Sequence, residues 1–325
     1  MELLNRPRRM RRTAHIRNMV AETRFHPKQL IYPLFIKKRG KRKQAVSSMA
    51  GQYRFPLAAL KEEVEILVSL GQRAFLLFGV GEPKDDMANS AADDDGVIPT
   101  ALRMLKQEFG SDIVLFTDVC LCAYMSHGHC GVLDGESVLN DETLPILADI
   151  AVCHASSGAD FVAPSDMMDG RVAVIRDALD LEDFGNTGIM SYSTKFASAY
   201  YGPFTDATDS ALVKGDRTSY QLDYRNGNEA IRESLADEEE GADILMVKPA
   251  MAYLDVIASI KSECDLPVAA YQVSGHYAMT KLAVQNGLAQ EEMLVRENMH
   301  ALCRAGADLI ISYHAKDIWE KKWFD

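Results

Sequence analysis

The sequence has no uninterrupted run of about 18 apolar residues, which is the length that a membrane-spanning helix requires. Its basic N-terminal stretch, residues 1–19, also lacks the apolar core of a secretory signal peptide. Basic residues are in the minority overall, and the formal net charge of −12 argues against nucleic acid as a partner of the main body. These absences predict a cytoplasmic protein with no membrane span and no nucleic-acid partner.

Cysteine is also scarce, with six in 325 residues, and a chain of this length does not need a disulfide scaffold. Three of the six lie close together at metal-ligand spacing. The other three, Cys153, Cys264 and Cys303, lie in or at the ends of predicted helices, where reduced thiols pack as small apolar groups. This distribution favours a reducing compartment.

No low-complexity linker divides the chain, and apolar β-rich runs alternate with helical patterns. Eight strands are predicted, at 30–36, 74–80, 112–120, 160–166, 188–195, 243–249, 267–275 and 308–315. Helices are predicted at 56–72, 98–109, 142–157, 171–182, 226–240, 253–264 and 288–305. Eight strands in one βα series predict a (β/α)8 TIM barrel over residues 29–325, with a doubly wound sheet as the alternative.

Polar side chains collect where these strands end, which is where barrel enzymes assemble their active sites. They are Cys120, Asp166, Lys195, Lys248, Ser274 and Tyr313. A Gly-Ala-Asp triplet also precedes three of the strands, at 158–160, 241–243 and 306–308. Its glycine is expected to cap the preceding helix in the left-handed conformation.

Residues 1–28 are predicted to form an extended N-terminal arm. Its arginines are compatible with a nucleic-acid or organelle-targeting segment. The preferred interpretation is an arm that packs on a neighbouring subunit of a homo-oligomer.

Cys120, Cys122 and Cys130 predict a zinc site. Three thiolates without a fourth protein ligand leave a coordination position open, as in catalytic zinc sites. His127 and His129 lie inside the same loop as candidate fourth ligands. On spacing alone, a structural metal and the absence of a metal are the alternatives.

Lys195 and Lys248 each end an apolar run, and we expect them on two non-adjacent strands that both face the barrel mouth. Burial and a second nearby ammonium would lower the pKa of either amine, which would make it a nucleophile for ketones. A structural ion pair is the alternative, and it is stronger for Lys195. With the zinc site, the two lysines point to carbonyl chemistry.

The segment 200–221 is long and rich in glycine, proline and aspartate, and we expect an active-site lid or a disordered insertion. Its Lys214, Arg217 and Gln221 are candidates for binding a carboxylate, with solvated surface charge as the alternative. Ser274 and Tyr313 offer hydroxyl groups for a second carboxylate, with buried core polar groups as the alternative.

Seven long stretches closely resemble the porphobilinogen synthase (5-aminolevulinate dehydratase) family, across essentially the whole chain. They are RPRRMRRTAHIRNMV, TDVCLCAYMSHGHCGVL, FVAPSDMMDGRV, SYSTKFASAYYGPF, GDRTSYQLD, ADILMVKPA and YQVSGHYAM. The resemblance implies a lyase of tetrapyrrole biosynthesis that condenses two molecules of 5-aminolevulinate into porphobilinogen with loss of two waters. It also implies a homo-octamer and, in some members, an allosteric magnesium ion, whose ligand position Glu233 matches.

By the same resemblance, Lys248 forms a Schiff base with the substrate that supplies the propionate side (the P site), and Lys195 serves the substrate that supplies the acetate side (the A site). The three cysteines hold zinc near the A site, with Asp118 beside it. The remaining implied substrate-binding residues are Ser274 and Tyr313 for the P-site carboxylate, Arg217 and Gln221 for the A-site carboxylate, and Tyr201.

Four positions depart from the family pattern. Thr205 replaces the lid arginine that grips the A-site carboxylate, His276 replaces an acid, His314 replaces an aromatic residue, and Ala123 replaces a bulkier or acidic residue. Lys214 is a candidate to compensate for the lost arginine. Two alternatives therefore stand beside the family reaction: a paralogue that forms a different pyrrole from another amino ketone, and a zinc-binding scaffold without catalytic activity.

Overall fold

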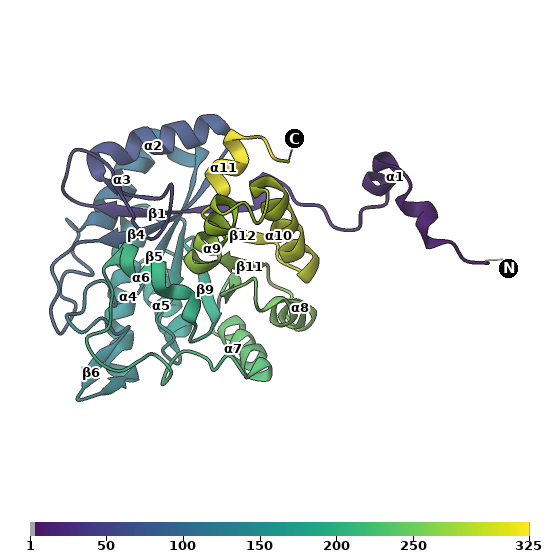
Figure 1. The fold of residues 1–325 in the computed structure, drawn as a ribbon. Coiled ribbons are helices and arrows are strands. Elements are labelled where there is room, and N and C mark those ends of the chain that lie inside the picture. Colours follow the sequence, from purple (N-terminus) through teal and green to yellow (C-terminus); the bar gives the residue numbers. More distant parts are fainter. Residues whose placement is uncertain (1–3, 325) are drawn as a thin grey trace.

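The computed structural model describes residues 4–324, and eight parallel strands form a closed barrel within them (Figure 1). They are β1 (Leu30–Lys37), β4 (Ala74–Val80), β5 (Val114–Val119), β8 (Phe161–Pro164), β9 (Gly188–Lys195), β10 (Ile244–Lys248), β11 (Val268–Gln272) and β12 (Leu309–Ser312). The barrel closes where β12 pairs with β1, with Leu30 opposite Ile310. The predicted (β/α)8 architecture and all eight predicted strands are confirmed, with shifts at their ends.

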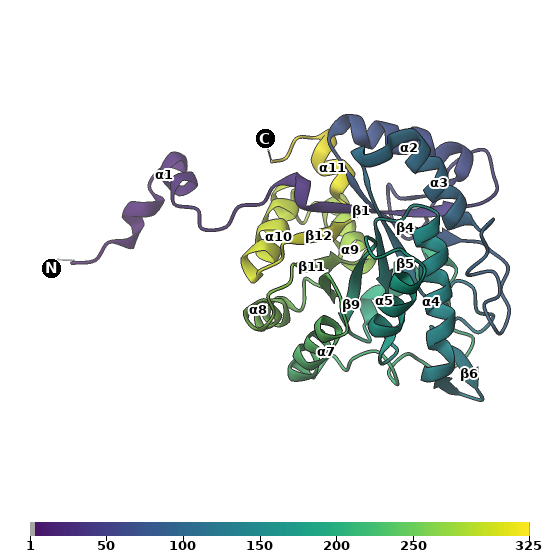
Figure 2. The same ribbon diagram turned by 180° about the vertical axis from the view of Figure 1, so that it is seen from behind.

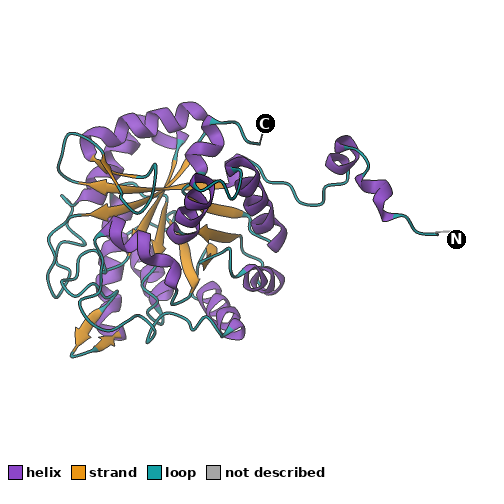
Figure 3. Ribbon diagram, viewed as in Figure 1, coloured by secondary structure: helices purple, strands orange, loops and turns teal. Residues whose placement is uncertain are grey.

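Helices surround the barrel, and all seven predicted helices are present (Figures 1 and 3). They are α2 (Leu57–Leu70), α3 (Val97–Phe109), α4 (Asn140–Ser156), α5 (Arg171–Leu181), α7 (Gly227–Glu239), α8 (Leu254–Glu263) and α10 (Glu291–Ala305). Four further α-helices were not predicted: α1 (Ala14–Met19), α6 (Gly202–Thr208), α9 (Ser274–Gln285) and α11 (Ala315–Glu320). The start of α9 was assigned to the preceding strand because Ser274 and Gly275 are weak helix formers.

The strands separate two apolar layers. Along β10, Leu245 and Val247 pack in the outer layer between barrel and helices, whereas Ile244 and Met246 fill the barrel interior. This two-residue period follows from strand geometry. It places Lys248, two residues after Met246, on the inner face.

The three Gly-Ala-Asp triplets behave as expected at their glycines, whose φ angles are 104° at Gly158, 101° at Gly241 and 114° at Gly306. The aspartate of each triplet has a role that the sequence did not reveal, because it accepts a hydrogen bond from a backbone N–H of the neighbouring strand. The pairs are Asp160 with Leu115 at 2.7 Å, Asp243 with Ile189 at 2.7 Å and Asp308 with Val268 at 2.8 Å. Each triplet therefore ends one helix and fastens two strands together.

The N-terminal arm contains η1 (Pro7–Arg11), α1 (Ala14–Met19) and η2 (Pro27–Gln29), and its first part extends away from the barrel (Figures 1 and 2). Neither η1 nor α1 has a buried residue. Phe25 anchors the end of the arm by packing edge-to-face on Phe324, with 4.4 Å between ring centroids. Contact with a neighbouring subunit stays a prediction. Within residues 4–324, no helix has the length and apolarity to cross a membrane.

Loops with short elements of their own cover one end of the barrel (Figure 3). After Cys130 comes the hairpin β6 (Val132–Asp134) and β7 (Ser137–Leu139), and after β1 come β2 (Gln44–Ala45) and β3 (Tyr53–Pro56). The segment 200–221 is not a disordered insertion, because it contains the end of η4 (Ala199–Tyr201) and the helix α6 (Gly202–Thr208).

Candidate active site

Lys195 and Lys248 are direct cross-strand partners at the ends of β9 and β10. The expectation of non-adjacent strands was wrong, because the fifth and sixth strands of the βα series are neighbours in the barrel. Both side chains are buried. The ammonium of Lys195 donates a hydrogen bond to the carbonyl of Ser165, and its Nζ lies 5.8 Å from the ring centroid of Tyr192.

Four aromatic rings enclose Lys248. Its Nζ lies 4.7 Å from the ring centroid of Tyr271, 4.8 Å from that of Phe204, 5.0 Å from that of Tyr192 and 5.3 Å from that of Tyr201. Burial, with the neighbouring charge of Lys195, lowers the pKa of Lys248 to about 7 despite the opposing effect of Asp118. A large fraction of this amine is therefore neutral and nucleophilic near neutral pH.

Asp118 comes from β5 and lines the same cavity as the two lysines. Burial raises the pKa of this carboxyl, whereas the charges of Lys195 and Lys248 lower it, and the net direction is upward. A carboxyl group with a raised pKa in the same cavity as two amines is suited to proton transfer.

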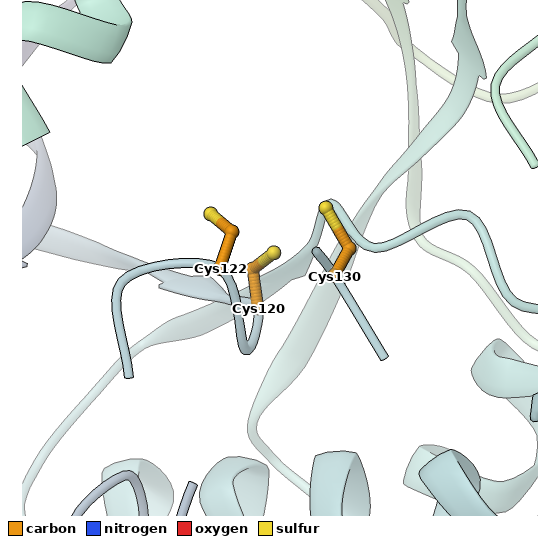
Figure 4. Close-up of side chains that lie close together, drawn as sticks. All are labelled: Cys120, Cys122 and Cys130. Atoms are coloured by element: carbon orange, nitrogen blue, oxygen red, sulfur yellow. The ribbon is translucent and has the colours of Figure 1, made fainter. Parts of the chain in front are cut away.

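The sulfur atoms of Cys120, Cys122 and Cys130 lie within 4.8 Å of one another. Figure 4 shows the three side chains close together, carried by two stretches of the loop after β5. All three thiols are free, and Cys120 and Cys130 are fully buried. Hydrogen bonds from the other two thiols lower the pKa of Cys130 well below its usual range. Soft donors at this separation fit a zinc ion.

Neither candidate histidine joins this cluster. Both ring nitrogens of His129 are engaged, with the hydroxyl of Tyr220 at 3.2 Å and the carbonyl oxygen of Lys214 at 3.1 Å. The Nδ1 of His127 accepts from the backbone N–H of His129 at 3.1 Å. The three cysteines therefore remain the ligand set that the geometry favours.

The cysteine loop and the lid 200–221 are bonded to each other. Arg217 donates to the carbonyl oxygen of Gly128 at 2.9 Å and to that of Ser210 at 3.2 Å. The backbone N–H of Cys130 donates to the hydroxyl of Tyr220 at 3.4 Å. Among residues 4–324 no carboxylate pairs with Arg217, and its Nε is buried without an acceptor. It is thus available to an anionic ligand.

A second set of bonds fastens the lid to the segment after β1. The carboxylate of Asp206 accepts from the hydroxyl of Ser48 at 2.6 Å, and Arg54 donates to the carbonyl oxygen of Ala207 at 2.7 Å. These contacts hold α6 over the barrel mouth, where Phe204 reaches Lys248.

One cavity under the lid unites most of the predicted site residues. Its lining is Asp118, Cys122, Cys130, Ser165, Lys195, Tyr201, Phe204, Thr205, Ser210, Arg217, Gln221 and Lys248. Sequence reasoning missed Ser165, Phe204 and Ser210, as well as Tyr192 and Tyr271. Alternate residues of a strand face the barrel interior, so the two tyrosines could have been predicted once the inward-facing positions of β9 and β11 were known.

The predicted P-site hydroxyl groups, of Ser274 and Tyr313, bond to residues whose rings surround Lys248. Ser274 accepts a hydrogen bond from the backbone N–H of Phe204 at 2.9 Å, and the hydroxyl of Tyr313 lies 3.0 Å from that of Tyr271. Both side chains are buried.

Lys214 and Thr205 differ in their relation to the cavity. Lys214 is exposed and does not line the cavity, so the structure does not bring it to the position of the missing arginine. Thr205 does line the cavity, and its hydroxyl donates to the carbonyl oxygen of Tyr201 at 3.2 Å.

The other departures lie outside the cavity lining. His276 stacks against Tyr200 with 4.2 Å between ring centroids, and His314 is buried 4.6 Å from the ring of Tyr277. Ala123 is half-buried beside the cysteines. Glu233, on α7, lines a separate surface cavity of about 580 Å³ that contains neither lysine and none of the cysteines.

A family model described as "Delta-aminolevulinic acid dehydratase" matches residues 4–321. The chain belongs to this family. It is therefore a lyase. A delta-aminolevulinic acid dehydratase of Archaeoglobus fulgidus is 51% identical over 316 residues, which are 97% of each chain. One from Bacillus subtilis is 48% identical over 319 residues, which are 98% of each chain.

The solved structures include a delta-aminolevulinic acid dehydratase (porphobilinogen synthase) from Toxoplasma gondii, in complex with the reaction product porphobilinogen. It superimposes with a TM-score of 0.96 at 44% identity and covers 98% of this chain and 92% of its own. The family's fold thus extends over nearly the whole chain.

Proposed function

We propose that the enzyme condenses two molecules of 5-aminolevulinate into porphobilinogen with loss of two waters, as a step of tetrapyrrole biosynthesis. The observation that carries this proposal is the paired placement of Lys195 and Lys248 in one closed cavity with Asp118 and the cysteines. Two amines side by side can activate two ketones for reaction with each other. Family membership supports the same reaction.

The first substrate binds covalently at Lys248. The neutral amine adds to the ketone carbon, and loss of one water gives an iminium ion. The aromatic rings around Lys248 would exclude water, and the hydroxyl groups of Ser274 and Tyr313, which contact Phe204 and Tyr271 of that set, would hold the carboxylate of this substrate. Asp118, in the protonated form that its raised pKa favours, would supply the proton with which the hydroxyl group of the addition product leaves as water.

The second substrate binds at Lys195. Its iminium ion makes the former ketone carbon electrophilic and acidifies the adjacent C–H, so that a carbon–carbon bond can form between the substrates. One substrate, after loss of that C–H proton, adds as an enamine to the iminium carbon of the other, and elimination then releases the lysine from that carbon. A free amino group adds to the remaining iminium carbon and expels the second lysine, which closes the ring, and loss of a ring proton gives the pyrrole. Arg217 and Gln221 line this side of the cavity and would hold the second carboxylate.

Cys120, Cys122 and Cys130 would hold zinc at the A-site end of the cavity. A zinc ion with an open position supplies a Lewis acid that stabilises negative charge on a substrate oxygen. The chain's own contribution is to hold three soft donors within 4.8 Å of one another and to fasten their loop to the lid.

Two assembly features complete the proposal. The arm is proposed to join subunits into an octamer, because its exposed helix α1 has no buried contact in the single chain. Glu233 is proposed as a ligand of an allosteric magnesium ion. Burial raises the pKa of Glu233, and the carboxylates of Asp237 and Asp169 contribute to that increase, which a bound cation would oppose.

An assay of pyrrole formation from 5-aminolevulinate tests the reaction. The expected result is porphobilinogen, with the mass of two substrates less two waters. If other amino ketones give pyrroles while 5-aminolevulinate gives none, the paralogue is the correct assignment. If no amino ketone gives a product, the proposed reaction is wrong.

We predict that the activity rises with pH up to about 7. The pKa of Lys248 is lowered to about 7, so the nucleophilic neutral form is lost as pH falls below that value. Below pH 7, kcat/KM should therefore fall about tenfold per pH unit. The charge of Lys195 contributes to the lowered pKa, so Lys195→Met should raise the pH midpoint for reductive methylation of Lys248. An unchanged midpoint in that variant would contradict this electrostatic account.

We predict that Thr205→Arg lowers the KM for 5-aminolevulinate. A threonine hydroxyl cannot replace the bidentate, charged contact of arginine with a carboxylate, which is worth roughly 2–5 kcal/mol when it is desolvated. A decrease of at least about tenfold is expected, which corresponds to about 1.4 kcal/mol. Lys214→Ala is the matched lid control and should change KM less than twofold because Lys214 is exposed. The reverse pattern would place Lys214 on the carboxylate.

A further inference from the structure

Strand β9 carries one residue more than β10 just before the two lysines. Leu245 pairs with Ser191, but Val247 pairs with Thr194, so that two steps along β10 match three steps along β9. The register is regular again where Lys248 pairs with Lys195. This is a β-bulge, which shifts every following side chain to the opposite face of the strand.

The bulge decides where Lys195 points. Met190 and Tyr192 face the barrel interior. In an unbroken strand the next inward positions would be 194 and 196, and Lys195 would point at the helices. Because of the bulge, Ser193 and Thr194 both face α7 and Lys195 faces the cavity.

A buried serine on α7 contacts both outward residues of the bulge. The Oγ of Ser234 donates to the Oγ of Ser193 at 3.2 Å and lies 3.0 Å from the Oγ1 of Thr194. Thr194 in turn donates to the carbonyl oxygen of Ala230 at 3.2 Å, and Ser193 donates to that of Met246 at 3.5 Å. Each of the three hydroxyl hydrogens thus has an acceptor.

The ordinary structural explanation for a serine within a helix does not account for Ser234. Such a hydroxyl commonly bonds to the carbonyl four residues earlier in its own helix. Here that carbonyl, of Ala230, accepts from Thr194 of the strand instead. One turn further along α7, Asp237 accepts from the hydroxyl of Ser191, the last residue of β9 that pairs with β10 before the bulge. The helix therefore contacts the strand on both sides of the irregularity.

We propose that Ser234 is a positioning residue for Lys195: together with Thr194 it holds the bulge that turns this amine into the cavity beside Lys248. The inference rests on the proposed role of Lys195 in binding the second substrate. It assigns a function to a residue of α7 that touches no substrate.

The test uses the full-length enzyme and borohydride trapping of 5-aminolevulinate, with adducts quantified separately at each lysine by peptide mass spectrometry. Thr194→Val removes the hydroxyl at almost constant volume, Ser234→Ala removes its partner, and Thr194→Ser restores a hydroxyl. In the first two variants, trapping at Lys195 should fall at least tenfold, whereas trapping at Lys248 should stay within twofold of wild type. Thr194→Ser should recover at least half of the Lys195 adduct.

Thr280→Ala is the matched control, since this buried hydroxyl bonds to a carbonyl of its own helix, that of His276. It should leave trapping at both lysines unchanged.

Wild-type trapping at Lys195 that persists in Thr194→Val and Ser234→Ala would overturn the positioning role alone. Absence of any Lys195 adduct in the wild type, with Lys248 trapped, would overturn the role of Lys195 in the proposed function and this inference with it. If Thr194→Val unfolds, the trapping result of Ser234→Ala decides alone: a selective loss of the Lys195 adduct supports the inference, and wild-type trapping at Lys195 contradicts it.

Discussion

Replacing Lys248 by methionine or arginine is expected to lower porphobilinogen formation by at least about a thousand-fold, the scale seen when a covalent nucleophile is removed. Methionine has no amine, and the guanidinium of arginine does not lose its proton to become a nucleophile. Borohydride added with 5-aminolevulinate should trap an adduct at Lys248 in the wild type and none at position 248 in either variant. A trapped adduct found only at another residue would refute the assignment.

Thermal unfolding separates loss of chemistry from loss of fold in these variants. A buried amine with a lowered pKa is a cost to the folded state, because the unfolded chain binds the proton more tightly. The pKa of Lys248 is about 7 in the folded protein and higher in the unfolded chain. The resulting loss of folding free energy is therefore complete below pH 7, and it shrinks as the pH rises from the folded pKa to the unfolded pKa. Lys248→Met should therefore unfold at a higher temperature than wild type at pH 7. Lys61→Arg, at an exposed ion pair with Glu108, is the control and should change neither property.

The second large effect is expected from the cysteines. Cys122→Ser combined with Cys130→Ser should abolish both zinc binding and product formation, because a single remaining thiolate cannot hold the ion. Elemental analysis should find about one zinc per wild-type chain and less than a tenth of that in the variant. Chelation of the wild type should remove activity, and added zinc should restore it.

Cys303→Ser is the matched control for loss of a thiol, since Cys303 lies half-buried on α10 and outside the cavity. It should retain full zinc content and activity. Full activity of the double variant without metal would show that the cluster has no catalytic part. Normal zinc content in the double variant would show that other ligands hold the ion.

The sequence was sufficient to predict the barrel because each strand is a continuous apolar run and each βα unit repeats the same pattern. It also singled out Lys195, Lys248 and the cysteines as site residues, because their residue types and strand-end positions are informative in themselves, and their roles stay predictions. The neighbouring placement of the two lysines was missed, although strand order in a barrel follows chain order.

Other features depend on information that is not local in the sequence. The bulge at Ser193 and Thr194 depends on contacts with α7, which lies about forty residues later in the chain. The sequence of β9 alone does not predict it. The aromatic rings around Lys248 come from two strands, β9 and β11, and from the lid. Lys214 looked like a replacement for the missing arginine because it lies in the same segment, but the path of the lid leaves it in solvent.

The closure of the barrel has a consequence for how the chain folds. Every other neighbouring pair among the eight described barrel strands joins strands that are consecutive in the βα series, whereas β1 meets β12 with Leu30 opposite Ile310. Bringing together two segments that lie about 280 residues apart costs chain entropy. The part of that cost that depends on loop length is about 5 kcal/mol. Local units can form early, and the β1–β12 seam is then the slowest contact to establish and the first to separate on unfolding. A circular permutant that joins the two ends and opens the chain between two other units would move this kinetic weak point away from Tyr313 and the site around Lys248.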